Sequence, residues 1–216
     1  MHILPFVRQY WERIGCDVVV FDNGSEDGSV EYLSMFPYVT VRHFDSDEYI
    51  TSTEPISSVL SRFNDHDGVL VYWKNYGVSG RLKKPVYDKP IYDIYTEPCG
   101  YELFSDFKYY KITKFCVNMN KWKPEHKYWI HNAPRNWIKA DGTYKRTEIV
   151  HEPLYLRHYI TKSVEEYLHK VYVRGMFHPS HRQLQSLYEM CPETKDMIDD
   201  GFREYFKNKY GVGIPE

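Results

Sequence analysis

The sequence has few cysteines, no long apolar run and almost no net charge, and each shortage excludes a class of protein. The four cysteines are scattered and include no C-x-x-C pair, so we expect reduced thiols rather than a disulfide framework or a zinc site. No apolar run reaches the roughly 18 residues that a membrane-spanning helix needs. The 28 basic and 30 acidic residues give a net charge of −2, which argues against a non-specific nucleic-acid binder.

The chain has the size and composition of a soluble globular protein. Its 216 residues are enough to bury a hydrophobic core. The beginning of the sequence does not resemble a secretion signal, so we expect a cytoplasmic location, and association with a membrane through a partner or a surface patch stays open. Aromatic residues are frequent, with 21 tyrosines, whose flat faces suit core packing as well as stacking on sugars or bases.

Apolar periodicity predicts an alternation of helices and strands. Residues 3–15 have the spacing of an amphipathic helix, and residues 17–21 form a short apolar run that is typical of a strand buried on both faces. A turn and helix over 22–36 and a second strand over 38–44 follow. This alternation predicts an α/β fold with a mostly parallel sheet flanked by helices.

The rest of the chain is predicted to add strands in its middle and helices at its end. The apolar run over 68–73 predicts a third strand. The first late helix opens with a capping box, in which Ser163 and Glu166 satisfy the backbone at the helix start, and Glu166 is spaced to pair with Lys170. The further predicted elements are a helix over 55–63, strands over 108–115 and 127–131, and helices over 163–175, 180–191 and 193–211.

Two polar clusters follow predicted strands, where ligands collect in α/β sheets. In "DNGSEDGS", Asp22 and Asn23 offer an acceptor and a donor to a nucleotide base or ribose, although a simple turn explains the same residues. In "HFDSDEYI", Asp45, Asp47 and Glu48 repel one another by about 1 kcal/mol or more per pair unless a cation lies among them. Carboxylates are ligands that Mg²⁺ and Mn²⁺ prefer, and a solvated acidic loop is the alternative explanation.

Four stretches of the sequence resemble the nucleotide-sugar glycosyltransferases of the GT-A fold, and more narrowly a family-2-like branch of them. The turn "DNGSEDGS" is similar to the first nucleotide-contacting turn of that branch, and "DSDEYI" is similar to its D-x-D-E metal motif. The stretch "VYWKNYGVSG" (71–80) resembles its W-x-x-F/Y-G-x-S-G segment. The stretch "LRHYITKSVEEYLHKVYVRG" (156–175) matches its H-Y-x-T-K-S-x-E-E-x-x-x-K-x-x-R-G signature almost position for position.

The resemblance implies a metal-dependent hexosyltransferase-type enzyme of polysaccharide biosynthesis. It would move a sugar from a nucleoside-diphosphate donor, with UDP as the expected nucleotide, to a hydroxyl of a glycan or glycoconjugate, with inversion at the sugar carbon. The expected cofactor is Mn²⁺ or Mg²⁺. Because the resemblance covers about residues 2–176, we expect a GT-A domain over 1–176 and a helical extension over 177–216 that packs on it.

The resemblance also implies roles for individual residues. Asp22 and Asn23 would contact the nucleotide, and Lys162 would lie near the diphosphate of the donor. Trp73 would help to shape the pocket for the sugar or the acceptor. The expected ligands of the cation are Asp45, Asp47 and His158, and Asp45 would also lie near the donor.

Several of these residues also have a purely structural explanation. His158 is equally well explained as an ordinary buried histidine, and a tryptophan such as Trp73 more often packs in a core than lines a site. An inverting enzyme also needs a carboxylate that takes the proton of the acceptor hydroxyl. Asp93 and Glu97, in "YDIYTEP", are the candidates for this base.

The sequence departs from the GT-A pattern in two places. A GT-A domain normally begins with a strand before its first helix, and it normally has a helix and a strand between "VTVRHF" and the metal motif. A sheet without these central strands would leave strand edges unpaired. We therefore expect that segments of the natural chain are missing from this sequence, or that the strands pair in another order. Asp45 then belongs either to the metal motif or to the preceding strand.

Two other functions stay open from the sequence. A metal-dependent phosphohydrolase would use the D-x-D pair as nucleophile and acid, but this interpretation leaves the stretch over 156–175 unexplained. A non-catalytic nucleotide-sugar-binding module would keep the fold without the chemistry. Phosphate release without an acceptor would identify the first, and nucleotide binding without turnover would identify the second.

Overall fold

The described residues of the computed structural model fall into two compact units. The helical unit comprises the described residues within Met1–Asp47, Tyr76–Gly100 and Tyr159–Glu216. The sheet unit comprises those within Glu48–Asn75 and Tyr101–His158. The structure describes residues 9, 19–20, 40–41, 47–99, 113–118, 120–121, 136–145, 148–175 and 184–215.

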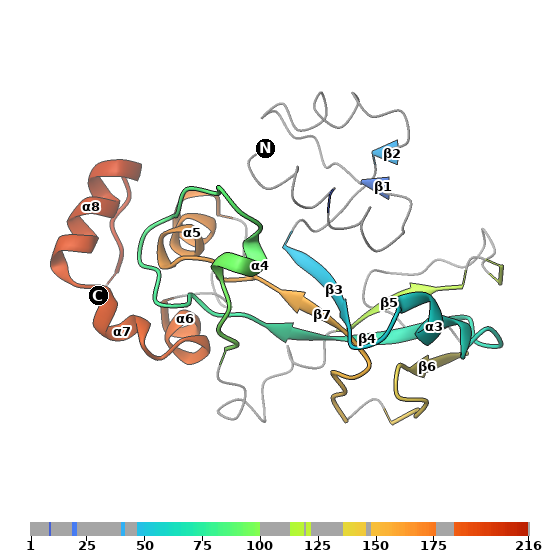
Figure 1. Cartoon of the computed structure of the whole chain (residues 1–216). Coiled ribbons are helices and arrows are strands. Elements are labelled where there is room, and N and C mark those ends of the chain that lie inside the picture. Colours follow the sequence, from blue (N-terminus) through green and yellow to red (C-terminus); the bar gives the residue numbers. More distant parts are fainter. Residues whose placement is uncertain are drawn as a thin grey trace. The chain divides into compact units, whose positions relative to one another are not determined.

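The sheet unit is built around β4 (Gly68–Asn75), in which all residues except Lys74 are buried. Its sequence GVLVYWKN places apolar and aromatic residues in succession, which suits a strand covered on both faces. β5 (Thr113–Val117) pairs antiparallel with one edge of β4. On the other edge, β6 (Trp137–Lys139) runs parallel to the first half of β4 and β7 (Leu154–His158) to the second half, as Figure 1 shows.

β3 (Glu48–Ser52) completes the sheet by pairing antiparallel with β7 along its whole length. This register places Glu48 opposite His158. The strand order is β3-β7-β4-β5, with β6 also beside β4, and α3 (Ile56–Ser61) follows β3 as the sequence predicts. The fold is α/β as expected, but the expectation of a mostly parallel sheet is not matched, because β3 and β5 run antiparallel to their neighbours.

The helical unit contains a short parallel pair of strands. β1 (Val19–Val20) pairs with β2 (Thr40–Val41), in agreement with the strands predicted over 17–21 and 38–44. The predicted strand over 127–131 lies outside the described residues, as does all of the predicted helix over 3–15 except position 9.

α5 (Val164–Leu168) begins with the capping box that the sequence predicts. The Ser163 hydroxyl accepts a hydrogen bond from the Glu166 backbone N–H, and the Glu166 carboxylate accepts one from the Ser163 backbone N–H. After Leu168 the chain widens into a π-helical turn, η3 (His169–Val173). π-Helical turns of this kind occur often at functional sites.

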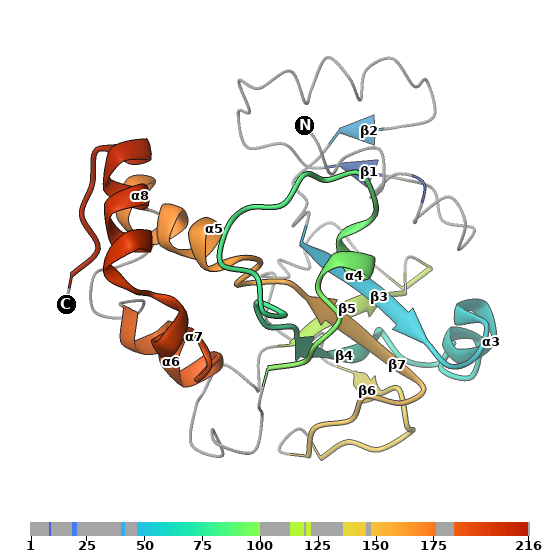
Figure 2. The same cartoon turned by 60° about the vertical axis from the view of Figure 1, so that its left-hand side comes forward.

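The C-terminal helices of the helical unit lie beside α5 (Figure 2). The stretch over 193–211, predicted as one helix, is divided into two. The break is explained by Asp199, whose carboxylate accepts a hydrogen bond from the Phe202 N–H at 2.7 Å and so starts a new helix. The helices of this region are α6 (Leu184–Met190), α7 (Thr194–Met197) and α8 (Asp200–Tyr210).

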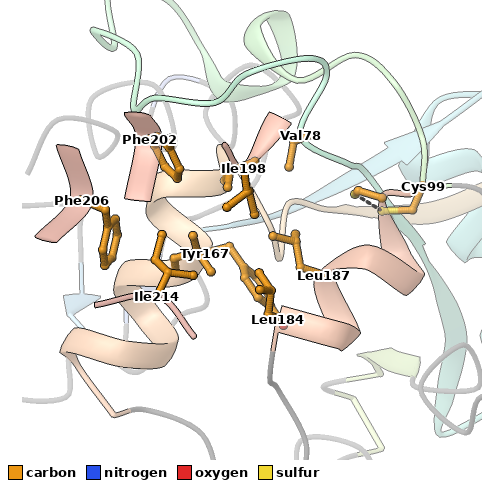
Figure 3. Close-up of a cluster of buried hydrophobic side chains, with 12 residues drawn as sticks. Val78, Cys99, Tyr167, Leu184, Leu187, Ile198, Phe202, Phe206 and Ile214 are labelled. Atoms are coloured by element: carbon orange, nitrogen blue, oxygen red, sulfur yellow. Dashed lines mark hydrogen bonds between the residues drawn. The ribbon is translucent and has the colours of Figure 1, made fainter. Parts of the chain in front are cut away.

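A hydrophobic cluster joins these helices to α5 and to the loop after β4 (Figure 3). The loop packs closely here, because a Cβ on Gly77 would lie only 3.0 Å from the Cys191 sulfur. None of the described helices, including the short α4 (Ile91–Ile94), is long and apolar enough to cross a membrane. The cluster consists of Val78, Cys99, Val164, Tyr167, Leu168, Leu184, Leu187, Cys191, Ile198, Phe202, Phe206 and Ile214.

The cluster predicts a large effect of truncating Phe206, which is fully buried on α8. We expect Phe206→Ala to lower the free energy of unfolding by about 3–5 kcal/mol, because it removes buried apolar surface and leaves a cavity. Lys207→Ala, at an exposed position of the same helix, should change it by less than about 0.5 kcal/mol. Urea unfolding followed by circular dichroism measures both, and equal midpoints for the two variants would contradict the assigned core.

Candidate functional site

The structure describes some of the predicted site residues and not others. Asp22, Asn23 and Asp45 lie outside the described residues. Asp47 and Lys162 belong to the helical unit, together with the candidate bases Asp93 and Glu97. His158 and Trp73 belong to the sheet unit.

Asp47 forms an ion pair with Lys170, a residue from the turn η3. Its Oδ2 atom lies 3.3 Å from the Lys170 Nζ atom, and each side chain is 18% exposed. The Asp47 carbonyl accepts a hydrogen bond from the Tyr159 N–H at 2.9 Å, so the backbone of Asp47 is also held. The carboxylate is therefore fixed in place while part of it still faces solvent.

The predicted pairing of Lys170 with Glu166 is wrong. Lys170 donates instead to Asp47 and to the Ile160 carbonyl, both at 3.3 Å. The Glu166 carboxylate is held by three hydroxyl groups: Tyr87 at 2.5 Å, Tyr95 at 2.9 Å and Ser163 at 2.8 Å. Glu166 thus serves the fold, as the capping pattern indicates, and the i,i+4 spacing alone does not decide its partner.

Lys162 adds a second ammonium group to this region. Its φ of +52° is in the left-handed range that residues other than glycine rarely adopt. Burial lowers the pKa of Lys162, the Asp47 charge acts against this shift, and the charge of Lys170 adds to it. The Glu166 charge also favours the ammonium form of Lys162 and the Lys84 charge opposes it, so Lys162 lies among both carboxylates and other lysines.

The N-terminus of α5 itself is not available to an anion. The Val164 N–H donates to the Arg81 carbonyl and the Glu165 N–H donates to the Leu82 carbonyl, both at 3.0 Å. The Glu166 N–H donates to the Ser163 hydroxyl. Because these groups are satisfied within the protein, binding of a phosphate near Lys162 must depend on side-chain ammonium groups rather than on the helix start.

Glu165 is a buried carboxylate that accepts hydrogen bonds from several segments of the helical unit. It is 1% exposed, and it accepts hydrogen bonds from the Lys84 N–H, the Lys209 ammonium and the hydroxyls of Tyr205 and Tyr210. Burial alone would raise the pKa of Glu165, but the hydrogen bonds, that of Lys209 first, hold it below its ordinary value. Glu165 therefore ties α8 and the loop at Lys84 to the first turn of α5.

In the sheet unit, His158 is buried and oriented by its neighbours. It is 6% exposed, and its Nδ1 atom lies 2.9 Å from Asn75 Oδ1. Its ring centroid lies 4.0 Å from that of Trp73. Since the Asn75 oxygen accepts, Nδ1 carries the proton, and a metal would have to bind through Nε2.

Further polar groups surround this histidine on the sheet. Glu48 lies opposite His158 in the β3–β7 pairing, and its Oε1 atom is 3.3 Å from Lys114 Nζ. The Lys114 ammonium also lies 5.7 Å from the centroid of the Trp73 ring. Trp73 is thus packed between polar partners at 9% exposure, which fits a supporting role as well as a pocket wall.

Within the described ranges, no three His, Cys, Asp or Glu residues come close enough together to hold a metal ion. Mg²⁺ and Mn²⁺, however, are commonly held by one or two carboxylates together with substrate phosphates and water. The partly exposed Asp47 carboxylate fits that use, because it is a hard oxygen ligand that solvent reaches.

The candidate bases are both exposed. Asp93 lies in the first turn of α4. Glu97 is fixed through its backbone, since its N–H donates to the Ser79 hydroxyl and its carbonyl accepts from the Gly77 N–H. These contacts position the loop but do not select either carboxylate as a base.

Sequence reasoning missed Lys170 as the partner of Asp47, because the two residues are 123 positions apart and no local pattern connects them. It also missed Tyr87 and Tyr95 as partners of Glu166. Nothing in the sequence distinguishes these two residues from the other tyrosines of a tyrosine-rich chain. A search of family models, curated proteins and solved structures found no match to the chain.

The bonding of Glu165 predicts a pH-dependent contribution to stability. At neutral pH, Glu165→Gln should lower the free energy of unfolding by about 2–3 kcal/mol, because an amide cannot accept all of these bonds and leaves donors unsatisfied. The folded-state pKa of Glu165 is lowered, so the wild-type advantage is complete above the unfolded pKa of about 4.3 and is lost as the pH falls through the folded pKa.

Urea unfolding of wild type and Glu165→Gln between neutral and acidic pH measures this difference. Glu204→Gln, an exposed position on α8, serves as the control and should show little change at any pH. A difference between wild type and Glu165→Gln that grew on acidification would contradict the assigned role.

Proposed function

We propose that the chain is a metal-dependent glycosyltransferase that moves a sugar from a nucleoside-diphosphate sugar, with UDP as the expected nucleotide, to a hydroxyl of a glycan or glycoconjugate. The observation that carries the proposal is the cluster of Asp47, Lys162 and Lys170. It offers one carboxylate for a divalent cation and two ammonium groups for the negatively charged diphosphate. The resemblance of residues 156–175 to a glycosyltransferase signature, which includes both lysines, supports the same function.

In this proposal each residue of the cluster has a separate role. Asp47 holds the cation, Mn²⁺ or Mg²⁺, through a carboxylate oxygen. The bound cation supplies Lewis-acid stabilisation of charge on the departing diphosphate. Lys162 donates hydrogen bonds to diphosphate oxygens from its place directly before the capped start of α5. Burial disfavours the protonated form of the Lys162 amine, and a bound anion would favour that form.

The remaining predicted residues complete the proposal. His158 keeps the role of a cation ligand that the resemblance implies, and Asn75 holds its ring. Trp73 would form part of the wall for the sugar or acceptor. Asp22, Asn23 and Asp45 would hold the nucleotide and, for Asp45, the cation. Inversion requires a base that removes the acceptor proton, and Asp93 and Glu97 are the candidates.

The proposal predicts that Asp47 is required for turnover. We expect Asp47→Asn to lower metal-dependent release of UDP from the accepted nucleotide sugar by at least about 100-fold, because the neutral amide binds a hard cation poorly. Asp196→Asn, at an exposed position on α7, should keep wild-type turnover. The substrate is first found by screening nucleotide sugars, with Mn²⁺ present, for a rise in melting temperature.

The outcomes of this experiment separate the possible functions. Full metal-dependent turnover by Asp47→Asn would refute the proposal. Phosphate release without an acceptor would identify a phosphohydrolase instead. Metal-dependent UDP binding in calorimetry, without turnover of any nucleotide sugar in the panel, would identify a binding module.

A further inference from the structure

The carboxylate that the proposed function gives to the cation already has a positive partner. Lys170 Nζ lies 3.3 Å from Asp47 Oδ2, so a cation that binds Asp47 meets an ammonium at the same group. We propose that Lys170 is a charge-exchange residue. It neutralises Asp47 before the cation binds, leaves the carboxylate when the cation arrives, and then contacts the diphosphate together with Lys162. This inference rests on the proposed function.

The ion pair is placed where it has a measurable effect. Both side chains are only 18% exposed, so water screens their attraction less than it screens a pair on the open surface. The Ile160 carbonyl accepts a second hydrogen bond from Lys170 Nζ at 3.3 Å. The ammonium is thus held from two sides, and its position does not depend on a freely rotating chain.

The backbone at Lys170 is also unusual. Lys170 lies in the π-helical turn η3, where the Arg174 N–H donates to the His169 carbonyl at 3.0 Å across five residues. A wider turn rotates the side chains that follow it relative to those of α5. This geometry turns Lys170 toward Asp47, whereas Glu166, one turn earlier, is bound by Tyr87 and Tyr95.

Electrostatics makes the ammonium and the cation competitors. A divalent cation on Asp47 would repel the Lys170 ammonium beside it, and the nearby Lys162 charge would add to this repulsion. The cation must therefore displace Lys170 or bind more weakly because of it. In either case, removing the charge of Lys170 strengthens cation binding when no nucleotide is present.

A diphosphate reverses the role of Lys170. Its negative charge attracts both lysine ammonium groups, so it relieves the repulsion that Lys170 exerts on the cation. Coupling between two ligands is reciprocal, and each therefore raises the affinity for the other. Removing the Lys170 charge should then weaken binding of the nucleotide while it strengthens binding of the bare cation.

The test measures binding rather than activity, on the full chain. Lys170→Met keeps the apolar stem and removes the charge, Lys170→Arg keeps the charge, and Lys207→Met changes an exposed lysine on α8 as the control. Mn²⁺ binding without nucleotide is followed by the electron paramagnetic resonance signal of free Mn²⁺. UDP binding at saturating Mn²⁺ is followed by calorimetry.

We expect Lys170→Met to bind Mn²⁺ alone about fivefold more tightly than wild type, the effect of losing one partly buried charge interaction. It should bind UDP at saturating Mn²⁺ about fivefold more weakly. Lys170→Arg and Lys207→Met should stay near wild type in both measurements. Opposite changes in the two affinities are the signature, because a general loss of structure would weaken both.

The outcomes distinguish this inference from the proposed function. If wild type binds no Mn²⁺, with or without UDP, the proposed function fails and the inference fails with it. If wild type binds both ligands but Lys170→Met binds Mn²⁺ alone no more tightly, the inference is overturned and the proposed function stands. If Lys170→Met lacks a cooperative melting transition, Lys170→Gln replaces it, and the same increase in Mn²⁺ affinity is required.

Discussion

The helical unit depends on how the first turn of α5 is satisfied. A helix start exposes N–H groups that have no partner within the helix, and here the carbonyls of Arg81 and Leu82 and the Ser163 hydroxyl accept from them. This arrangement joins a distant loop to α5 and fixes the residue before the cap, Lys162, in a left-handed conformation. The N–H groups of the first turn are therefore not available to an anion, which must be held by lysine side chains.

The acidic residues of this unit differ in what surrounds them. This difference distinguishes the carboxylates that stabilise the fold from the one that is a candidate for ligand binding. Glu165 is buried among donors that join α5 to α8 and to the loop at Lys84. Glu166 is likewise held by hydroxyl groups. Asp47 instead pairs with the Lys170 ammonium and is partly exposed to solvent. A buried and fully bonded carboxylate stabilises a fold, whereas a partly exposed carboxylate is the one to which the proposed function gives a cation.

Local patterns predicted the elements whose cause is local. The apolar run of β4, the helix α3 and the capping box at Ser163 all follow from neighbouring residues. The pairing of β3 with β7 could not be predicted, because the acidic start of β3 reads as a loop and its partner strand is about a hundred residues away. The partner of Asp47 is equally remote, and the nearer candidate, Glu166 for Lys170, was wrong because hydroxyl groups occupy Glu166.

The stretch over 156–175 combines residues with separate physical tasks, so its resemblance to an enzyme signature is not equally informative at each position. Ser163 and Glu166 cap a helix and would be needed in any protein with this turn. Lys162 and Lys170 do not cap α5, and both are partly buried. Lys162 instead adopts a backbone conformation that costs of order 1 kcal/mol for a residue with a Cβ. Burial disfavours the charged form of Lys162, and a bound anion would favour that form again. The two lysines therefore support the proposed function more strongly than the other residues of the stretch.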